Sequence, residues 1–172
     1  GTVSANERAW KPLREATLTL GICAAPDDAY QILRGLRTMG VRLAAHEKSA
    51  IEIARWLEGQ TQVAAVLHPA LESHPGHALW KRDFRGASGI FSFVLATGGT
   101  KEAHAFLDTL KLFGLGYSWG GYESLAVHVQ LGDRTVAKGK YAGPVIRWQI
   151  GLEDTADLIG DIRNGLEAAA AG

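Results

Sequence analysis

The glycine-rich stretch over residues 110–125, LKLFGLGYSWGGYESL, constrains the fold of this chain more than any other segment. Apolar residues at helical spacing lead into it, at Leu107, Leu110 and Phe113. Gly114 and Gly116 then break the helix, because glycine reaches left-handed backbone angles at no steric cost. A run of strand composition follows. The stretch is therefore a helix-to-strand connection, and its irregular part lies between the end of the helix and the start of the strand.

Three residues with hydrogen-bonding side chains stand between the glycines of this stretch. Tyr117, Ser118 and Trp119 supply a phenol, a hydroxyl and an indole, and Gly120 and Gly121 follow them directly. Glycine on both sides lets the backbone approach another group closely. Connecting loops of this kind often carry function on a rigid scaffold. The pattern is equally typical of a turn in which two aromatic side chains fill a gap, so the residues alone leave both interpretations open.

Composition excludes several classes of protein. Eighteen Lys and Arg residues balance 18 Asp and Glu residues, so the charge favours neither nucleic acid nor an anionic membrane as a partner. No apolar run approaches the roughly 18 residues that suggest a membrane-spanning helix. A length of 172 residues suggests one domain with a real core. The single cysteine, Cys23, excludes an internal disulfide, and with no signal peptide recognised at the start it favours a reducing, cytoplasmic location.

Capping signals place two helices in the first third of the chain. Residues 2–5 have the composition of a strand end, and Asn6 is a favourable N-cap for the first helix. Pro26, with two aspartates behind it, is typical of the first position of a second helix. We expect Gly40 to interrupt or bend this second helix before it ends near Gly59.

The longer remaining part of the chain alternates between strands and helices. Runs of strand length occupy four segments, namely 63–68, 88–95, 124–129 and 145–150. Thr100 is predicted to cap a helix that ends at Phe113, and the last helix starts near residues 153–155. Residues 71–86 and 132–143 are predicted to be loops. This order predicts an α+β fold whose mainly antiparallel sheet carries its helices on one side.

Alternation within the last predicted strand separates two faces. In VIRWQI, residues 145–150, the two isoleucines and Trp148 share one face and Arg147 lies on the other. The first face must contact the core, so Arg147 points away from it. The residues on either side of Arg147 on its own face carry no charge that could pair with it. A solvated arginine and an anion-binding arginine both fit this pattern.

Two glycine patterns resemble nucleotide-binding motifs without matching them. Gly114, Gly116 and Gly120 nearly form a dinucleotide fingerprint, but the last glycine is one residue late and a helix rather than a strand precedes them. The sequence GGTK at 98–101 lacks the upstream glycine of a phosphate loop and has Thr and Lys in the wrong order. Helix capping explains it better.

The histidines and the cysteine give no sign of a reactive or metal-binding site. His68, His74 and His77 have no cysteine or fourth ligand at zinc-binding spacing, so we expect no metal there. Cys23 has no neighbour that suggests activation, and we expect it to be buried as a small apolar residue.

Four blocks of sequence carry a resemblance to a known family. In chain order they are APDDAYQILRGLRTMGVRLAAHEKSAIEIARWL, VLHPALESHPGHALWKRDFRGASGIFSFVL, LKLFGLGYSWGGYESL and GPVIRWQIGLEDTADLI. They resemble consecutive segments of the cystathionine beta-lyases, which belong to the pyridoxal-phosphate enzymes of cysteine and methionine metabolism. Because the four blocks keep their order and cover nearly the whole chain, the resemblance is more specific than any single short motif.

The resemblance implies the carboxyl-terminal portion of a fold type I pyridoxal-phosphate enzyme. It implies that residues 1–40 are the tail of the cofactor-binding large domain and residues 41–172 the small domain. It begins just after the segment that would hold the Schiff-base lysine, and the chain opens at Gly1 without an initiator methionine. We therefore expect a fragment that lacks this lysine, does not hold pyridoxal 5'-phosphate and is inactive alone. Its apolar stripe from Asn6 to about Leu36 should pack poorly on its own chain.

The resemblance also implies roles for individual residues. The family's arginine in IRxxIGLED, here Arg147, binds the α-carboxylate of the substrate, and a planar guanidinium suits this role. The residues at Ser118 and Trp119 line the same pocket, Ser118 partly through its backbone, and Tyr117 is near the reacting centre. The sequence YSWGG favours the beta-lyases over their gamma-synthase and gamma-lyase relatives, which tend to have ESLGG.

The implied reaction of the complete enzyme is β-elimination of cystathionine or a related sulfur amino acid. It releases a thiol, pyruvate and ammonia, with pyridoxal phosphate as the electron sink. The implied partners are the small-molecule substrate, the enzyme's own N-terminal domain and further copies in a dimer or tetramer. The residues alone also allow a stand-alone α+β module without catalysis, which binds an amino acid through its carboxylate or serves as an interaction domain. A lysine-bearing segment upstream of Gly1 would favour the enzyme.

Overall fold

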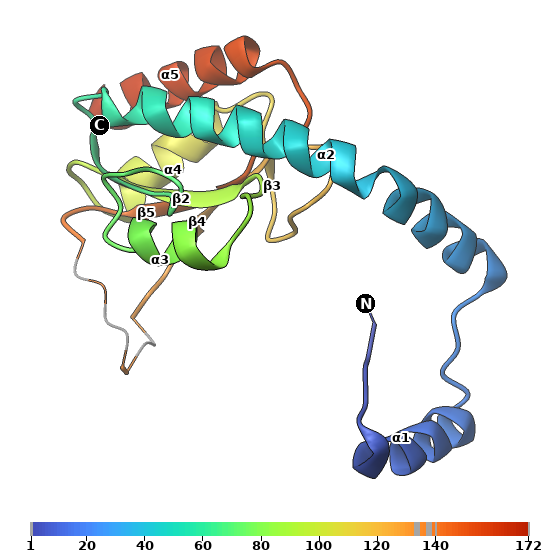
Figure 1. Ribbon diagram of the computed structural model, residues 1–172. Coiled ribbons are helices and arrows are strands. Elements are labelled where there is room, and N and C mark those ends of the chain that lie inside the picture. The colour runs from blue at the N-terminus through green and yellow to red at the C-terminus, as the bar shows by residue number, and fades with distance from the viewer. Residues whose placement is uncertain (1, 133–134, 137–138, 140, 172) are drawn as a thin grey trace. The chain divides into compact units, whose positions relative to one another are not determined.

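The computed structural model describes residues 2–132, 135–136, 139 and 141–171 (Figure 1). Its elements are, in chain order, α1 (Glu7–Leu20), α2 (Pro26–Glu58), β1 (Val63–Leu67), α3 (His77–Asp83), β2 (Ile90–Leu95), α4 (Thr100–Thr109), β3 (Gly114–Leu115), β4 (Leu125–Val129), β5 (Val145–Gln149) and α5 (Thr155–Ala171). No helix among the described residues combines the length and the apolar character needed to cross a membrane. Part of the loop predicted over 132–143 lies outside the described residues.

The chain divides into two compact units, Gly1–Met39 and Gly40–Gly172. The boundary between them falls inside α2, which is a single helix of 33 residues. The prediction that Gly40 interrupts this helix is therefore wrong. One interior glycine costs a helix only about 1 kcal/mol, which the hydrogen bonds of the flanking turns outweigh.

Local capping defines the helix of the first unit. The Asn6 side chain caps α1 as predicted, because it accepts a hydrogen bond of 3.0 Å from the backbone of Ala9. Gly21 ends the helix at a φ of 65°, in the left-handed conformation that glycine favours. The strand predicted over residues 2–5 is wrong, since these residues pair with no strand in the described part of the chain.

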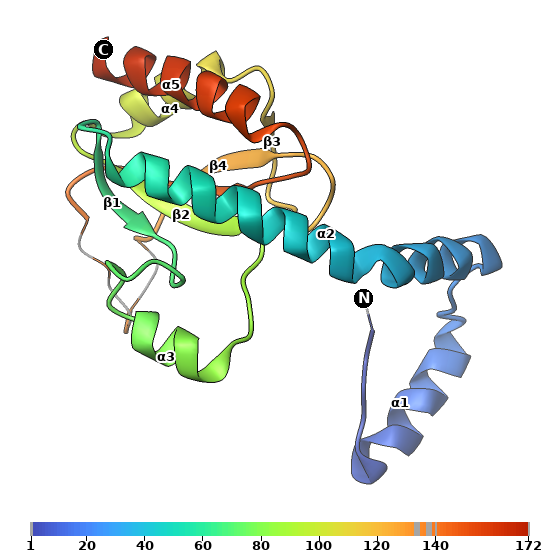
Figure 2. The same cartoon turned by 45° about the horizontal axis from the view of Figure 1, so that its top comes forward.

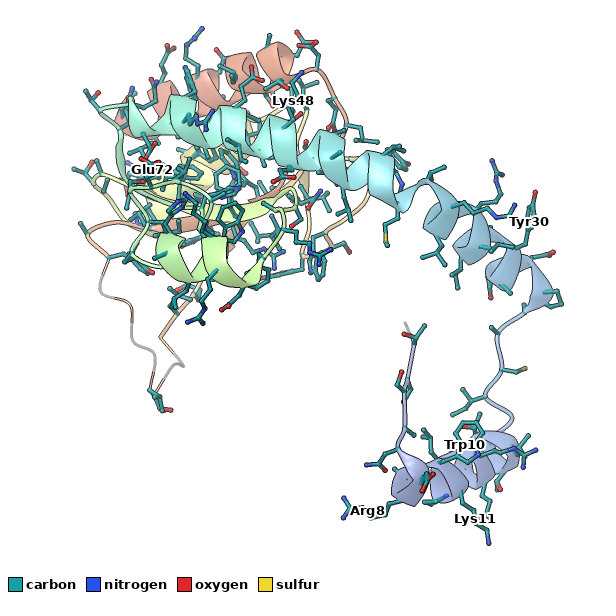
Figure 3. The ribbon with its side chains drawn as sticks, in the orientation of Figure 1. Arg8, Trp10, Lys11, Tyr30, Lys48 and Glu72 are labelled. Carbon is teal, nitrogen blue, oxygen red and sulfur yellow. The ribbon has the colours of Figure 1, made fainter. Side chains whose placement is uncertain are left out.

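The first unit has little core of its own. No residue of α1 is buried, and all buried residues of α2 lie from His46 onward, in the second unit. The side chains of Trp10 and Tyr30, which Figure 3 labels, are 57% and 62% exposed. Within the first unit, no residue of the stripe from Asn6 to about Leu36 is buried, and its poor packing on the chain as a whole stays a prediction.

A five-stranded sheet organises the second unit, with the strand order β1-β2-β5-β4-β3. The central strand, β5, pairs antiparallel with β2 along one edge and with β4 along the other. β1 pairs antiparallel with β2, and the short β3 pairs parallel with β4. The predicted α+β fold with a mainly antiparallel sheet is confirmed.

Three helices share one side of this sheet. Within the second unit, α2, α4 and α5 lie on one side in both Figure 1 and Figure 2, whereas α3 lies on the other. α4 and α5 pack directly on each other. The prediction of a loop over residues 71–86 missed α3, which is short and has no buried residue, so no apolar periodicity marks it.

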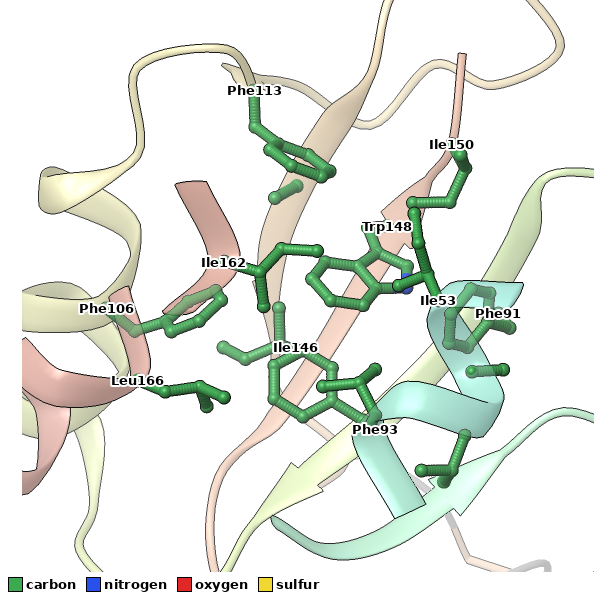
Figure 4. Close-up of a cluster of buried hydrophobic side chains, with 14 of the residues drawn as sticks. Ile53, Phe91, Phe93, Phe106, Phe113, Ile146, Trp148, Ile150, Ile162 and Leu166 are labelled. Carbon is green, nitrogen blue, oxygen red and sulfur yellow. The ribbon is translucent and has the colours of Figure 1, made fainter. Parts of the chain in front are cut away.

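The core lies between the sheet and these three helices, and Trp148 of β5 is at its centre (Figure 4). The Trp148 ring stacks on Phe113, with ring centroids 5.5 Å apart, and lies 4.6 Å from the ring of Phe93. Aliphatic side chains of the helices complete the cluster, including Ile53, Leu57, Leu158, Ile162 and Leu166. Each such side chain contributes about 1.5–3 kcal/mol when it is fully buried. The predicted core face of β5 is confirmed, since Trp148 and both isoleucines of that face are at most 1% exposed.

The helix before the glycine-rich stretch differs from the prediction at both ends. α4 ends at Thr109 rather than Phe113, because the backbone of Leu110 is extended and Phe113 turns into the core instead. Thr100 is the first residue of α4 rather than its cap. The Glu102 carboxylate caps the helix by accepting a hydrogen bond of 2.6 Å from the backbone N–H of Gly99.

We expect Gly165→Ala to destabilise the protein by about 1–3 kcal/mol. A Cβ at this position of α5 would lie 2.9 Å from the Phe106 ring and 3.1 Å from the Phe106 backbone oxygen. Gly160→Ala in the same helix is the matched control, because no described atom lies within 4 Å of a Cβ there. It should raise the free energy of unfolding by about 0.5–1 kcal/mol through helix propensity alone. Chemical denaturation measures both changes, and equal effects would contradict this packing of α5 on α4.

Candidate functional site

Arg147 lies in the middle of the sheet, on the face opposite the core. Across β5 it is paired with Ser92 of β2 and Val127 of β4. Its neighbour Trp148 points into the core, so strand alternation places Arg147 on the other face, as predicted. Neither cross-strand neighbour carries a charge.

The glycine-rich loop orients the guanidinium of Arg147. The Nη2 atom donates a hydrogen bond of 2.6 Å to the backbone oxygen of Tyr117, and Cζ lies 5.7 Å from the centre of the Tyr117 ring. The Nε atom is buried without a hydrogen-bond partner, and no carboxylate of the described residues lies within 4.0 Å of the guanidinium. An unpaired buried donor costs about 1–3 kcal/mol. Arg147 therefore has charge and donor capacity available for an anion.

The other predicted site residues follow Tyr117 at the open tip of the loop. Ser118 and Trp119 are both exposed, Trp119 to 64%. No hydrogen bond joins either residue to Arg147 within the described part of the chain. Gly120 then turns the backbone at a φ of 85°, a conformation that residues with a side chain rarely adopt. The structure brings Arg147 and Tyr117 together and leaves Ser118 and Trp119 accessible beside them.

Glu153 holds the end of this loop, a role that the sequence analysis missed. Its Oε1 accepts a hydrogen bond of 2.7 Å from the backbone N–H of Ser124, and its Oε2 accepts one of 2.8 Å from the Ser124 hydroxyl. The Ser124 oxygen also accepts a hydrogen bond of 2.9 Å from the backbone N–H of Gly151. Ser124 is fully buried, so the loop end is fixed away from water. The sequence placed Glu153 only at the start of the last helix, and nothing in its spacing marks this contact.

Asp161 holds the beginning of the same loop. Its side chain, 6% exposed on α5, accepts hydrogen bonds of 3.0 Å from the backbone N–H of Lys111 and of 2.8 Å from that of Leu112. Backbone donors that leave water need a partner, and this carboxylate supplies it where α4 has already ended. The loop is thus held by one carboxylate at each end.

His46 of α2 lies beside the Glu153 network and is 1% exposed. Burial lowers the pKa of His46, and the nearby charge of Arg42 lowers it further, whereas Glu153 and the Gly121 backbone raise it. The imidazole is therefore neutral at neutral pH, and it places no full positive charge next to the Glu153 carboxylate.

The histidines between β1 and α3 shape their own loop. Nδ1 of His68 accepts a hydrogen bond of 3.1 Å from the Ala70 backbone, and Nδ1 of His74 accepts one of 3.0 Å from the Gly76 backbone. Burial lowers the pKa of both imidazoles. No group of three residues with metal-binding side chains is found among the described residues. The predicted burial of Cys23 is wrong, because this cysteine is exposed in the connector between α1 and α2, which has no core around it.

Residues 1–167 match the family described as Cys/Met metabolism PLP-dependent enzymes, and the chain belongs to that family. A protein of Rhizobium johnstonii, provisionally named as a cystathionine beta-lyase, is 67% identical over 99% of this chain and 44% of its own length. The cystathionine beta-lyase of Salmonella typhimurium is 48% identical over 96% of this chain and 43% of its own length. The chain therefore spans less than half the length of these relatives.

A solved structure shares the fold. The cystathionine gamma synthase from Xanthomonas oryzae pv. oryzae, crystallised in complex with cystathionine, has a TM-score of 0.82 and 38% identity, over 98% of this chain and 45% of that one. The predicted fold type I class of pyridoxal-phosphate enzymes is confirmed, as is the resemblance to the cystathionine beta-lyases.

The site residues of this chain fit a carboxylate rather than the cofactor of the family. Pyridoxal phosphate is bound through a lysine Schiff base and needs a partner for its ring nitrogen. Arg147, Tyr117, Ser118 and Trp119 include no lysine that could form this Schiff base. The unpaired Nε of Arg147 instead suits a planar anion with two oxygens. No chemical step is therefore assigned to the cofactor from these residues.

We expect the free energy of unfolding to fall on acidification below about pH 6.5, the ordinary pKa of histidine. His46 and His68 have lowered pKa values in the folded chain, so below that pH the unfolded chain binds more protons. Their contribution is complete above the unfolded pKa and is lost as pH falls toward the folded one. His46→Gln should reduce this dependence between pH 6.5 and 5, measured by urea denaturation at each pH. A dependence unchanged by the substitution would contradict the assignment.

Proposed function

We propose that this chain is the carboxyl-terminal portion of a pyridoxal-phosphate-dependent carbon–sulfur lyase. The complete enzyme performs β-elimination on cystathionine or a related sulfur amino acid and releases a thiol, pyruvate and ammonia. The proposal rests on Arg147, which has an unpaired Nε and no carboxylate of the described residues within 4.0 Å, and which lies against the Tyr117 end of an exposed, glycine-flanked loop. A guanidinium of this kind binds a carboxylate through two parallel charge-assisted hydrogen bonds, and every amino-acid substrate carries one.

In this proposal each site residue has a separate task. Arg147 binds the α-carboxylate and so fixes the orientation of the substrate. Ser118, an exposed residue, supplies further donors to the same group, and Trp119 covers it from the loop tip. Tyr117, whose ring lies beside the guanidinium, is near the reacting centre. Trp119 within YSWGG supports the β-elimination branch, as does the higher identity to a beta-lyase than to a gamma synthase.

The same proposal assigns the two parts of the chain to domains. Residues 1–40 form the tail of the cofactor-binding large domain, and residues 41–172 form the small domain. The exposed apolar side chains of the first unit, such as Trp10 and Leu36, support this assignment, because large apolar patches are rarely left open. The enzyme's own N-terminal domain, or further copies in a dimer or tetramer, would cover them. The free cysteine, Cys23, supports a reducing, cytoplasmic location.

The cofactor-binding groups belong, in this proposal, to the rest of the enzyme. The Schiff-base lysine and the groups that hold pyridoxal 5'-phosphate precede this chain, since the relatives are more than twice as long as the part that matches it. The 172 residues alone should therefore neither hold the cofactor nor catalyse elimination.

We expect Arg147→Lys in the complete enzyme to lower kcat/KM for cystathionine by roughly ten- to 150-fold. Lysine keeps the positive charge but loses the two-point fork, and the loss of one charge-assisted hydrogen bond costs roughly 1.5–3 kcal/mol. Arg147→Ala should cost more. Both variants should retain pyridoxal phosphate and nearly the same Tm, because the side chain lies off the core. Steady-state kinetics, the cofactor's absorbance and thermal melts measure these three properties.

Arg163→Lys is the matched control, because Arg163 is exposed on α5, where its guanidinium lies 5.8 Å from the ring centre of Trp56. It should leave kcat/KM unchanged. Full activity in Arg147→Ala would sink the proposal, as would loss of cofactor without loss of substrate affinity. Binding of the amino acid without any elimination would instead favour a non-catalytic module, which the self-contained core of the second unit makes the alternative.

A further inference from the structure

The loop that carries Tyr117, Ser118 and Trp119 is attached to β5 and its extension at more than one point. Arg147 of β5 donates to the backbone oxygen of Tyr117 at 2.6 Å. Farther along, the backbone N–H of Leu152 donates to the oxygen of Tyr122 at 2.8 Å. Any shift of the loop relative to β5 therefore changes how the Arg147 guanidinium is held.

Glu153 and Ser124 determine where this loop ends. Both carboxylate oxygens of Glu153 accept hydrogen bonds from Ser124, one of 2.7 Å from its backbone N–H and one of 2.8 Å from its hydroxyl. The hydroxyl oxygen of Ser124 also accepts a hydrogen bond of 2.9 Å from the backbone N–H of Gly151, two residues after the end of β5. The three groups form a closed bridge between the last residue of the loop and the chain that leaves the central strand.

The bridge leaves no space for adjustment. A Cβ at Gly151 would collide with the Tyr122 oxygen, with the backbone of Glu123 and with the Glu153 carboxylate. Ser124 itself is fully buried. Ser124 and Gly151 therefore hold the end of the loop in one position, since close-packed groups leave little room for a shift.

We propose that Glu153, acting through Ser124, is a positioning residue for the substrate carboxylate. It holds the loop in the position in which the Tyr117 oxygen orients Arg147 and in which Ser118 and Trp119 face the substrate carboxylate. This inference rests on the proposed function of Arg147 as the carboxylate ligand. Asp161 acts in the same way at the start of the loop, through its hydrogen bonds to the backbone of Lys111 and Leu112.

The test compares a carboxylate ligand with its uncharged analogue in the complete holoenzyme. L-Alanine has no leaving group at its β-carbon, so L-alanine and L-alaninamide serve as competitive inhibitors that differ only in the carboxylate. The ratio of their inhibition constants measures how well the site selects a carboxylate. We expect Glu153→Ala to lower this preference roughly tenfold, and Glu153→Gln, which keeps the shape and one acceptor oxygen, to lower it by about threefold or less.

A double-mutant cycle separates positioning from a general loss of stability. Glu153→Ala and Arg147→Lys should be non-additive in kcat/KM for cystathionine, because both act on the placement of one carboxylate. Backbone amides of residues 117–121 should exchange hydrogen faster in Glu153→Ala, while those of the core strands stay protected. Ser124→Ala removes only the hydroxyl, and it carries the same test if Glu153→Ala does not fold.

Glu47→Gln is the matched control, because the Glu47 carboxylate also accepts a backbone hydrogen bond, 3.1 Å from Ala87, and Ala87 lies outside this loop. It should leave the carboxylate preference unchanged. Additive effects of Glu153 and Arg147, with an unchanged preference and a lower Tm, would overturn the inference and leave the role of Arg147 intact. An unchanged preference in Arg147→Ala as well would overturn the proposed function itself.

Discussion

β5 lies between two partner strands, and this position determines which of its side chains enter the core and which reach the site. Hydrogen bonding to β2 and β4 along both edges fixes the rotation of the strand, so that Trp148 must enter the core and Arg147 must leave it. The packing of Trp148 against Phe93 and Phe113 then holds the strand in this register. The packing of the core on the opposite face therefore keeps Arg147 in place. A shift of β5 by one residue would move every side chain of the strand to the other face.

The part of the site that the sequence could predict is the part that lies within one strand. Period-two alternation was sufficient to assign Trp148 to the core and Arg147 to the other face, because both residues belong to β5. Capping chemistry likewise predicted Asn6 at the start of α1. Each of these inferences uses residues that are neighbours along the chain, and their outcome does not depend on how distant segments meet.

The parts that the sequence could not predict depend on contacts between distant segments. The sequence predicted only a helix break at Gly114 and Gly116, and the pairing of Gly114 and Leu115 with β4 is what makes β3 a strand. Glu153 and Asp161 meet the glycine-rich loop across 29 and 50 positions of sequence, respectively, for their contacts with Ser124 and Lys111. A glutamate before a helix and an aspartate within one have an ordinary local role, so no pattern marks them as loop anchors. The expected break at Gly40 was wrong because it relied on a local preference alone. The cost of about 1 kcal/mol for one interior glycine is too small to interrupt a helix of this length.

A crystal structure of the complete holoenzyme with cystathionine bound would show whether Arg147 and the loop beside it form the carboxylate site of a carbon–sulfur lyase. We expect both oxygens of the reacting half's α-carboxylate to lie within about 3.2 Å of Arg147 nitrogens, with Nε now paired. We also expect Ser118 or Trp119 to contact the same group. A carboxylate bound elsewhere, with the Nε of Arg147 still unpaired, would show that Arg147 is not the carboxylate ligand.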